Sequence, residues 1–183
     1  MATPPVFSAG AVLTASQMNA VGLWLVKTVT VGTAVSTVNV TSCFNADYDN
    51  YVISYSNITA SVTGNAMLIK MLVGTTPTIN GFYGNTLYVV NAGAGALTNA
   101  NQVNSSFGEV GCMTSVFKNA STCEIQQPFL STQTLLTFSA VDNNYWRFGS
   151  FVVNNNTSYD GFQLLPNSGT MTGGTISVYG RRK

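Results

Sequence analysis

The chain consists largely of short runs of β-branched and aromatic residues separated by turn formers, and this pattern indicates its fold class. Val, Ile, Thr, Phe and Tyr gather in these runs, and such residues fit a pleated, half-buried surface. Clusters of Gly, Asn and Ser interrupt the runs at spacings of about ten residues. Many short strands without intervening helices indicate a sandwich or a barrel. We therefore predict an all-β domain, and within that class a β-sandwich of the jelly-roll type.

Alternation of side chains within the runs supports strands. Tyr51, Ile53 and Tyr55 share one face of a predicted strand, because successive side chains of a strand point to opposite sides. Ile176 and Val178 are expected to face together for the same reason. The predicted strands are residues 26–31, 36–40, 51–56, 67–73, 87–90, 110–117, 122–126, 135–140, 146–153, 162–165 and 175–179.

Two stretches are predicted as long loops. Residues 91–102 include the small-residue sequence Gly-Ala-Gly-Ala, and residues 154–159 are rich in turn formers. Loops carry binding more often than strands do, but we favour plain connectors for both stretches.

The first 26 residues differ from the rest of the chain. Pro4 and Pro5 have a fixed φ and disfavour helix, so the chain is expected to start extended. This segment is too short to form a core of its own. We therefore divide the chain into a docking arm, residues 1–26, and a β-sandwich domain, residues 27–183.

One short helix is predicted inside the arm. Thr14 and Gln17 have the spacing of a capping box, and apolar residues follow at helical spacing. Gly22 weakens this helix by about 1 kcal/mol relative to Ala, so it needs a partner surface to persist. That surface could belong to its own domain, to a sister subunit or to another protein. The predicted docking residues are Pro4, Pro5, Phe7, Leu13, Met18 and Trp24.

Charge and hydropathy argue against two classes of partner. Charged residues make up only 7% of the chain, and the net charge is +1. Nucleic-acid binding needs a clustered basic face, whereas the longest basic stretch here is the terminal Arg181-Arg182-Lys183. No apolar run approaches the roughly 18 residues of a membrane span, and no secretion signal is recognisable. We predict neither nucleic-acid binding nor membrane insertion.

Catalytic and metal-binding chemistry is poorly provided for. The chain has no His, which removes the commonest general base and metal ligand. Cys43, Cys112 and Cys123 form no Cys-X-X-Cys pair, so we expect buried free thiols and not a disulfide scaffold. Asp47 and Asp49 lie close together but fit a turn better than a calcium loop. The sequence predicts no enzyme, no metal and no cofactor.

Aromatic residues offer a candidate face for a glycan or a protein partner. Tyr145 and Trp146, with Arg147 and next to two Asn residues, could form a sugar-stacking face, and Tyr159 is counted with them. Tyr83 and Tyr88 are further candidates. The favoured interpretation of the first pair is the start of a strand whose ring fills the core.

Three segments carry a resemblance to a known group of proteins. The opening Pro4-Pro5-Val6-Phe7-Ser8-Ala9-Gly10-Ala11-Val12-Leu13-Thr14-Ala15-Ser16-Gln17-Met18-Asn19 resembles the N-terminal segment of many tailed-phage virion proteins. The sequence Ala46-Asp47-Tyr48-Asp49-Asn50-Tyr51 and the end from Ser168 to Gly180 look like the same group. Its members are described as minor tail, fibre or head decoration proteins.

The resemblance implies a non-enzymatic structural protein of the virion, assembled in the cytoplasm of the bacterial host. Its partners would be phage capsid or tail proteins and further copies of itself, most simply as a homotrimer. On a head it would be a decoration, or cement, protein; on a tail it would be a fibre or tip component. The alternative is a receptor- or carbohydrate-binding module of the tail that contacts host surface glycans. A lyase or hydrolase of cell-surface polymer is a remote third option.

Overall fold

The protein is built from β-strands. The structure, a computed structural model, describes Gly10, Val12, residues 22–90, Gly95, residues 97–116 and residues 118–182. Residue 182 is described by its backbone alone. Over these residues the regular elements run from β1 to β15, and no helix occurs among them. The described part of the chain therefore contains no helix that could cross a membrane.

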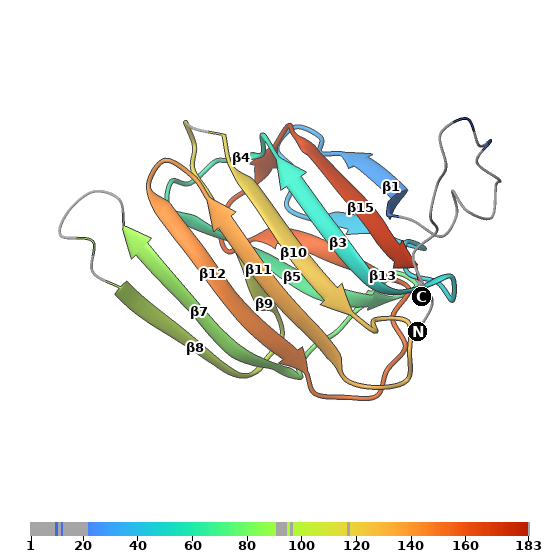
Figure 1. Ribbon diagram of the computed structural model, residues 1–183. Coiled ribbons are helices and arrows are strands. Elements are labelled where there is room, and N and C mark those ends of the chain that lie inside the picture. Colours follow the sequence, from blue (N-terminus) through green and yellow to red (C-terminus); the bar gives the residue numbers. More distant parts are fainter. Residues whose placement is uncertain are drawn as a thin grey trace.

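Eight strands form the larger sheet, which is antiparallel throughout and faces the viewer in Figure 1. In sheet order they are β1 (Leu23–Thr30), β15 (Thr175–Arg182), β3 (Tyr48–Ser56), β10 (Ala120–Gln126), β11 (Thr134–Val141), β12 (Tyr145–Val153), β7 (Phe82–Val90) and β8 (Leu97–Ser105). The edges of this sheet are β1 and β8.

A smaller sheet lies behind the larger one (Figure 1). Its strands are β2 (Val38–Val40), β13 (Gly161–Pro166), β5 (Asn65–Val73), β6 (Thr76–Pro77) and β9 (Gly108–Met113), with β6 and β9 both paired to β5. A minimal third sheet joins β4 (Thr59–Ala60) and β14 (Met171–Thr172). The two main sheets enclose one hydrophobic core, so the fold is a β-sandwich.

Alternation of buried and exposed side chains explains why some of these segments form half-buried strands. In β11, Leu136, Phe138 and Ala140 are buried, while the residues between them are exposed. The three residues of β3 predicted to share a face, at positions 51, 53 and 55, are all buried in the core. Ile176 and Val178 of β15 are also both buried. The predicted alternation is thus confirmed in β3 and β15.

Each predicted strand overlaps a strand of the structure, but the predicted loop at 91–102 is wrong. Its second half belongs to β8, which pairs with β7 in the register Leu97–Val89 and Asn99–Leu87. The sequence of β8 is rich in Asn and has no buried residue. Such a strand gives little hydrophobic signal, and polar composition is how natural sheets protect an edge.

The predicted helix and the boundary of the arm also need correction. Leu23, Trp24 and Leu25 lie in β1, where Trp24 stands opposite Gly180 of β15. Pairing with the neighbouring strand overrides the local helical spacing here. The sandwich therefore begins at residue 23, and the boundary drawn between 26 and 27 falls inside a strand. The rest of the predicted helix, and Pro4, Pro5, Phe7, Leu13 and Met18, lie outside the described residues.

Candidate functional site

A pocket lies between the two sheets near the edge strand β8. It has a volume of about 330 Å³. Residues of both sheets line it, among them Tyr88, Ala100, Phe107, Glu109, Tyr145 and Arg147. The strands β7, β8 and β12 supply one wall, and β5 and β9 supply the opposite wall. We call this hollow the edge pocket.

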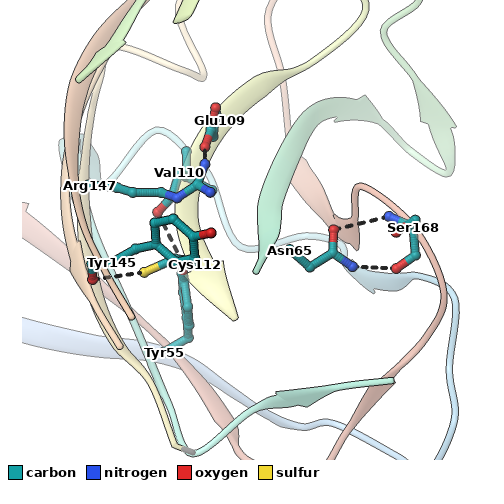
Figure 2. A network of polar contacts seen from close by, with 8 residues as sticks. All are labelled: Tyr55, Asn65, Glu109, Val110, Cys112, Tyr145, Arg147 and Ser168. Carbon is teal, nitrogen blue, oxygen red and sulfur yellow. Dashed lines mark hydrogen bonds and ion pairs between the residues drawn. The ribbon is translucent and has the colours of Figure 1, made fainter. Parts of the chain in front are cut away.

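A buried ion pair joins the two walls. Arg147 of β12 and Glu109 of β9 are only 8% and 6% exposed, and the guanidinium Nη1 contacts the carboxylate Oε1 (Figure 2). Burial lowers the pKa of Arg147 from its ordinary value, but a guanidinium remains protonated in proteins. Each of these two buried charges stabilises the other, because either one alone would be buried without an opposite charge to compensate it.

Two tyrosine rings flank the guanidinium. Its Cζ atom lies 5.0 Å from the ring centroid of Tyr88 and 5.0 Å from that of Tyr145. The rings are 6.2 Å apart and tilted by 70°. Strand register creates this arrangement, since Tyr88 of β7 stands directly opposite Arg147 and Tyr145 lies two residues before it on the same face. Rings at this distance attract the cation through their π-systems.

The guanidinium keeps one donor unused. Arg147 Nε is buried and has no hydrogen-bond partner among the described residues. A buried donor without a partner costs free energy, and its presence in a native site calls for an explanation.

The turn between β11 and β12 holds Tyr145 in place. Asp142 Oδ1 accepts hydrogen bonds from the backbone N–H groups of Asn144 and Tyr145, at 2.7 and 2.8 Å. The Cys112 thiol donates to the Tyr145 carbonyl oxygen at 3.7 Å (Figure 2). Gly64 has φ +74° and passes close to the Tyr145 hydroxyl, so that a Cβ atom there would lie 3.1 Å from it. The backbone of Tyr145 is therefore fixed at its N–H and carbonyl groups, and its hydroxyl lies close to Gly64.

The neighbouring strand β9 is fixed by a buried tyrosine. Tyr55 Oη donates to the carbonyl oxygen of Val110 at 3.0 Å, and Ser121 Oγ donates to the same oxygen at 2.9 Å. Burial raises the pKa of Tyr55 well above its ordinary value, so the phenol stays protonated as a donor. A Cβ atom at Gly111 would lie only 1.5 Å from Tyr55 Oη, so the hydroxyl occupies the space of the missing side chain. Glu109 is thereby held on a rigid strand.

A further contact closes the rim beside the pocket. Asn65 of β5 donates through Nδ2 to the Ser168 carbonyl oxygen, and its Oδ1 accepts from the Ser168 N–H at 3.2 Å (Figure 2). This pair anchors the loop that carries Asn167, which lines the pocket.

The aromatic platform predicted from the sequence does not form. Tyr145 lines the edge pocket, whereas Trp146 is 60% exposed on the opposite face of the larger sheet. Tyr159 is 1% exposed, and its hydroxyl donates to Asn155 Oδ1 at 2.8 Å. The prediction of one shared face is therefore wrong, because consecutive residues of a strand point to opposite sides and Tyr159 packs into the core.

Sequence reasoning missed the ion pair, although a signal was present. Phe151 and Val153 of β12 are buried, and Arg147 has the same parity in the strand. Glu109 is the lone charged residue in a strand that is buried along its length. An inward-facing charge in such a strand indicates a side chain that requires a buried partner, although the pattern does not identify that partner.

The other side of the larger sheet carries an exposed apolar surface, which we call the outer face. It is formed by the outward side chains of β11, β12, β7 and β8. Trp146 stands opposite Val141 on one side and Val89 on the other, and Phe148 stands opposite Leu87. A hollow of about 430 Å³ lies beside Val141, Trp146 and Phe148. The apolar side chains on this face are therefore contiguous.

The outer face is also uncharged. The sequences of β7, β8 and β11 contain no Asp, Glu, Lys or Arg, and the single charged residue of β12 is the inward-facing Arg147. A surface of this composition can meet another copy of itself without desolvating a charge.

The three thiols are buried and free, as predicted. Burial raises the pKa of Cys43 and of Cys123 to about 12, and it also raises the pKa of Cys112. They are thus protonated and unreactive at neutral pH. Within the described ranges, no group of three or more His, Cys, Asp or Glu side chains could hold a metal ion.

Comparison with known proteins assigns no family. No protein-family model and no curated protein sequence matches this chain. It is similar to a chain in the structure of infectious bursal disease virus Gx strain, at 10% sequence identity and a TM-score of 0.12. The likeness covers 86% of this chain and 41% of that chain, so this chain spans less than half of the other. A TM-score this low carries no argument about fold or function.

Proposed function

We propose that this chain is a non-enzymatic structural subunit of a tailed-phage virion that associates with other subunits through its outer face. Its partners are further copies of itself, as a homotrimer, and phage capsid or tail proteins. The three sequence segments that resemble virion proteins support this role. The observation that carries the proposal is the outer face, which is exposed, apolar and uncharged.

The strand order supports a jelly roll, an architecture found in viral capsid and lectin domains. In the smaller sheet the order is β2, β13, β5 and then β9, and in the larger sheet β3 precedes β12, β7 and β8. From β2 onward the chain passes back and forth between the two sheets. The strands β10 and β11 are inserted between β3 and β12, while β15 and β1 widen the same sheet. We infer an elaborated jelly roll.

The outer face has the character of a subunit interface. Large contiguous apolar patches on soluble proteins mark interaction sites, and Trp is enriched where interfaces concentrate their binding energy. Trp146, Phe148 and Leu97 are all exposed there. Packing this face against another copy buries them without burying a charge, which suits closed, symmetric association.

The arm is proposed as the attachment to the particle. It enters the sandwich at β1, which is the edge of the larger sheet opposite β8. Attachment at β1 leaves the outer face of β7, β8 and β12 free for contacts with sister subunits. On a head this geometry describes a cement protein that bridges capsid subunits, and on a tail it describes a fibre component.

Immunogold labelling of purified phage particles, with an antibody against the sandwich, tests the proposal. Gold over the head would establish a decoration protein. Gold confined to the tail would establish a fibre or tip component. Particles without gold, in a preparation where control antibodies against known virion proteins do label, would overturn the virion assignment.

A further inference from the structure

We propose that the edge pocket binds one uncharged pyranose sugar unit, with the Arg147–Glu109 pair as the polar contact and Tyr88 and Tyr145 as the aromatic contact. This inference goes beyond the structural role and does not depend on it. A subunit that assembles through its outer face can hold a ligand in the edge pocket, because the two lie on opposite faces of the larger sheet.

Charge in the pocket selects an uncharged ligand. The guanidinium of Arg147 and the carboxylate of Glu109 neutralise each other. An anion entering the pocket meets the carboxylate, and a cation meets the guanidinium. The pair nevertheless brings hydrogen-bond donors and acceptors side by side to the wall of the pocket, which both residues line. Sugar hydroxyls are both donors and acceptors, so they match such a pair.

The aromatic groups favour a sugar over a flat base. A planar base stacks best against a parallel ring, but the rings of Tyr88 and Tyr145 are tilted by 70° to each other. They leave no parallel-sided slot. A pyranose is puckered and presents apolar C–H groups beside its hydroxyls. These groups match two tilted rings and the adjacent Arg147–Glu109 pair.

The size and rigidity of the edge pocket favour a ligand of a single sugar unit. The volume of about 330 Å³ is near the lower end of the range of about 300–1,000 Å³ for small-molecule sites. The backbone of Tyr145 and the strand of Glu109 are both held by hydrogen bonds, so little backbone ordering is needed on binding. Asn167, which lines the pocket beside Gly64, supplies a further amide donor and acceptor.

Nuclear magnetic resonance titration of the full chain tests the inference. The probes are methyl α-glucopyranoside, methyl β-galactopyranoside and N-acetylglucosamine, with adenosine as the flat competitor. At least one sugar is expected to give saturable shifts at Tyr88 and Tyr145. Ala100→Trp, which fills the pocket from β8, is expected to weaken that sugar at least tenfold. Tyr88→Leu replaces one ring with a smaller apolar side chain, and it is expected to weaken sugar binding as well.

Trp146→Ala is the matched control, because its side chain leaves the same strand on the opposite face. It is expected to leave the affinity unchanged, and thermal melting identifies variants that are folded. No saturable shift with any of the sugars would overturn the inference. If Ala100→Trp and Tyr88→Leu bind the sugar as tightly as the wild type does, the sugar binds outside the edge pocket. Loss of sugar binding in Trp146→Ala would lead to the same conclusion. Binding of adenosine in preference to the sugars would overturn the ligand class.

Discussion

Tyr145 and Trp146 are neighbours in the chain but serve opposite faces of the larger sheet. The ring of Tyr145 lies 5.0 Å from the guanidinium carbon of Arg147 inside the sandwich, while Trp146 is 60% exposed outside it. The period-two geometry of β12 thus connects the edge pocket and the outer face through one strand. Substitutions on this strand can test the two surfaces separately.

Trp146→Lys is expected to weaken self-association while leaving the fold intact. A charge introduced into an uncharged apolar interface must be desolvated without a partner, whereas the same charge on an exposed monomer surface changes stability by about 0.5 kcal/mol or less. Sedimentation velocity over a range of concentrations measures the effect. Thr75→Lys, in an exposed turn after β5, is the control and should associate as the wild type does. If both variants associate equally, the outer face is not the surface through which the subunits associate.

Removing either partner of the Arg147–Glu109 pair is expected to destabilise the fold strongly. Glu109→Leu leaves the guanidinium buried without compensation, and Arg147→Met does the same to the carboxylate. Each is expected to lower the free energy of unfolding by about 3–5 kcal/mol. In the double variant, the free energy of unfolding is expected to fall by much less than the sum of the two single losses, because no unpaired charge is buried. Urea denaturation of all four proteins measures the coupling, and additive losses would contradict a direct pair.

Gly111→Ala is expected to destabilise the sandwich by several kcal/mol, on the order of the larger overpacking effects. The added Cβ would lie 1.5 Å from Tyr55 Oη, so the tyrosine or β9 must move. Tyr55→Phe alone loses its hydrogen bond to Val110 at a cost of about 0.5–1.5 kcal/mol. In the Gly111→Ala background, Tyr55→Phe is expected to lower the free energy of unfolding by less, or to raise it, because it removes the clashing hydroxyl oxygen. Gly32→Ala, whose Cβ meets only a side chain at 3.2 Å, is the mild control.

Alkaline pH is expected to destabilise the protein through its buried thiols. The pKa of Cys43 and of Cys123 is raised by burial from 9.0 to about 12. A raised pKa in the folded state means that stability is fully present below the unfolded value and is lost as pH rises through the folded value. The free energy of unfolding should therefore fall between pH 9 and about pH 12. Urea titrations at successive pH values measure it, and Cys123→Ala should show a shallower fall.

Removal of residues 1–21 is expected to separate attachment from folding. A chain that starts at Gly22 retains β1 and its pairing with β15, so it should melt near the wild-type temperature. A chain that starts at Lys27 loses Leu23–Val26 from that strand and should melt lower. Neither should co-sediment with phage particles if the arm provides the attachment. Normal particle association of the Gly22 variant would show that attachment lies in the sandwich.

The sequence predicted most of the strands because alternation in half-buried strands is a local signal. Tyr51, Ile53 and Tyr55 illustrate this, since one face of β3 is read directly from their spacing. The strand β8 was missed because an edge strand is selected for polarity and buries little. The spacing that placed Leu23 to Leu25 in a helix was overruled by pairing with β15, which depends on residues about 150 positions later in the chain.

The site was harder to predict than the fold. Tyr145 and Tyr88 were singled out from sequence, but their relation through Arg147 depends on the register of β7 against β12. Glu109 comes from a different sheet, and no pattern along the chain brings it to Arg147. Contacts between sheets depend on strand order, which short-range periodicity does not contain.

The absence of charge on β7, β8 and β11, and the inward direction of the single charge on β12, set how a contact through the outer face responds to its surroundings. Dissolved ions screen interactions between charges, so they have little to act on at such a contact. Its strength should change little up to moderate salt concentrations, where screening is the main effect of salt, and hydrophobic association weakens on cooling. A particle held together in this way tolerates changes in ionic strength and loosens in the cold.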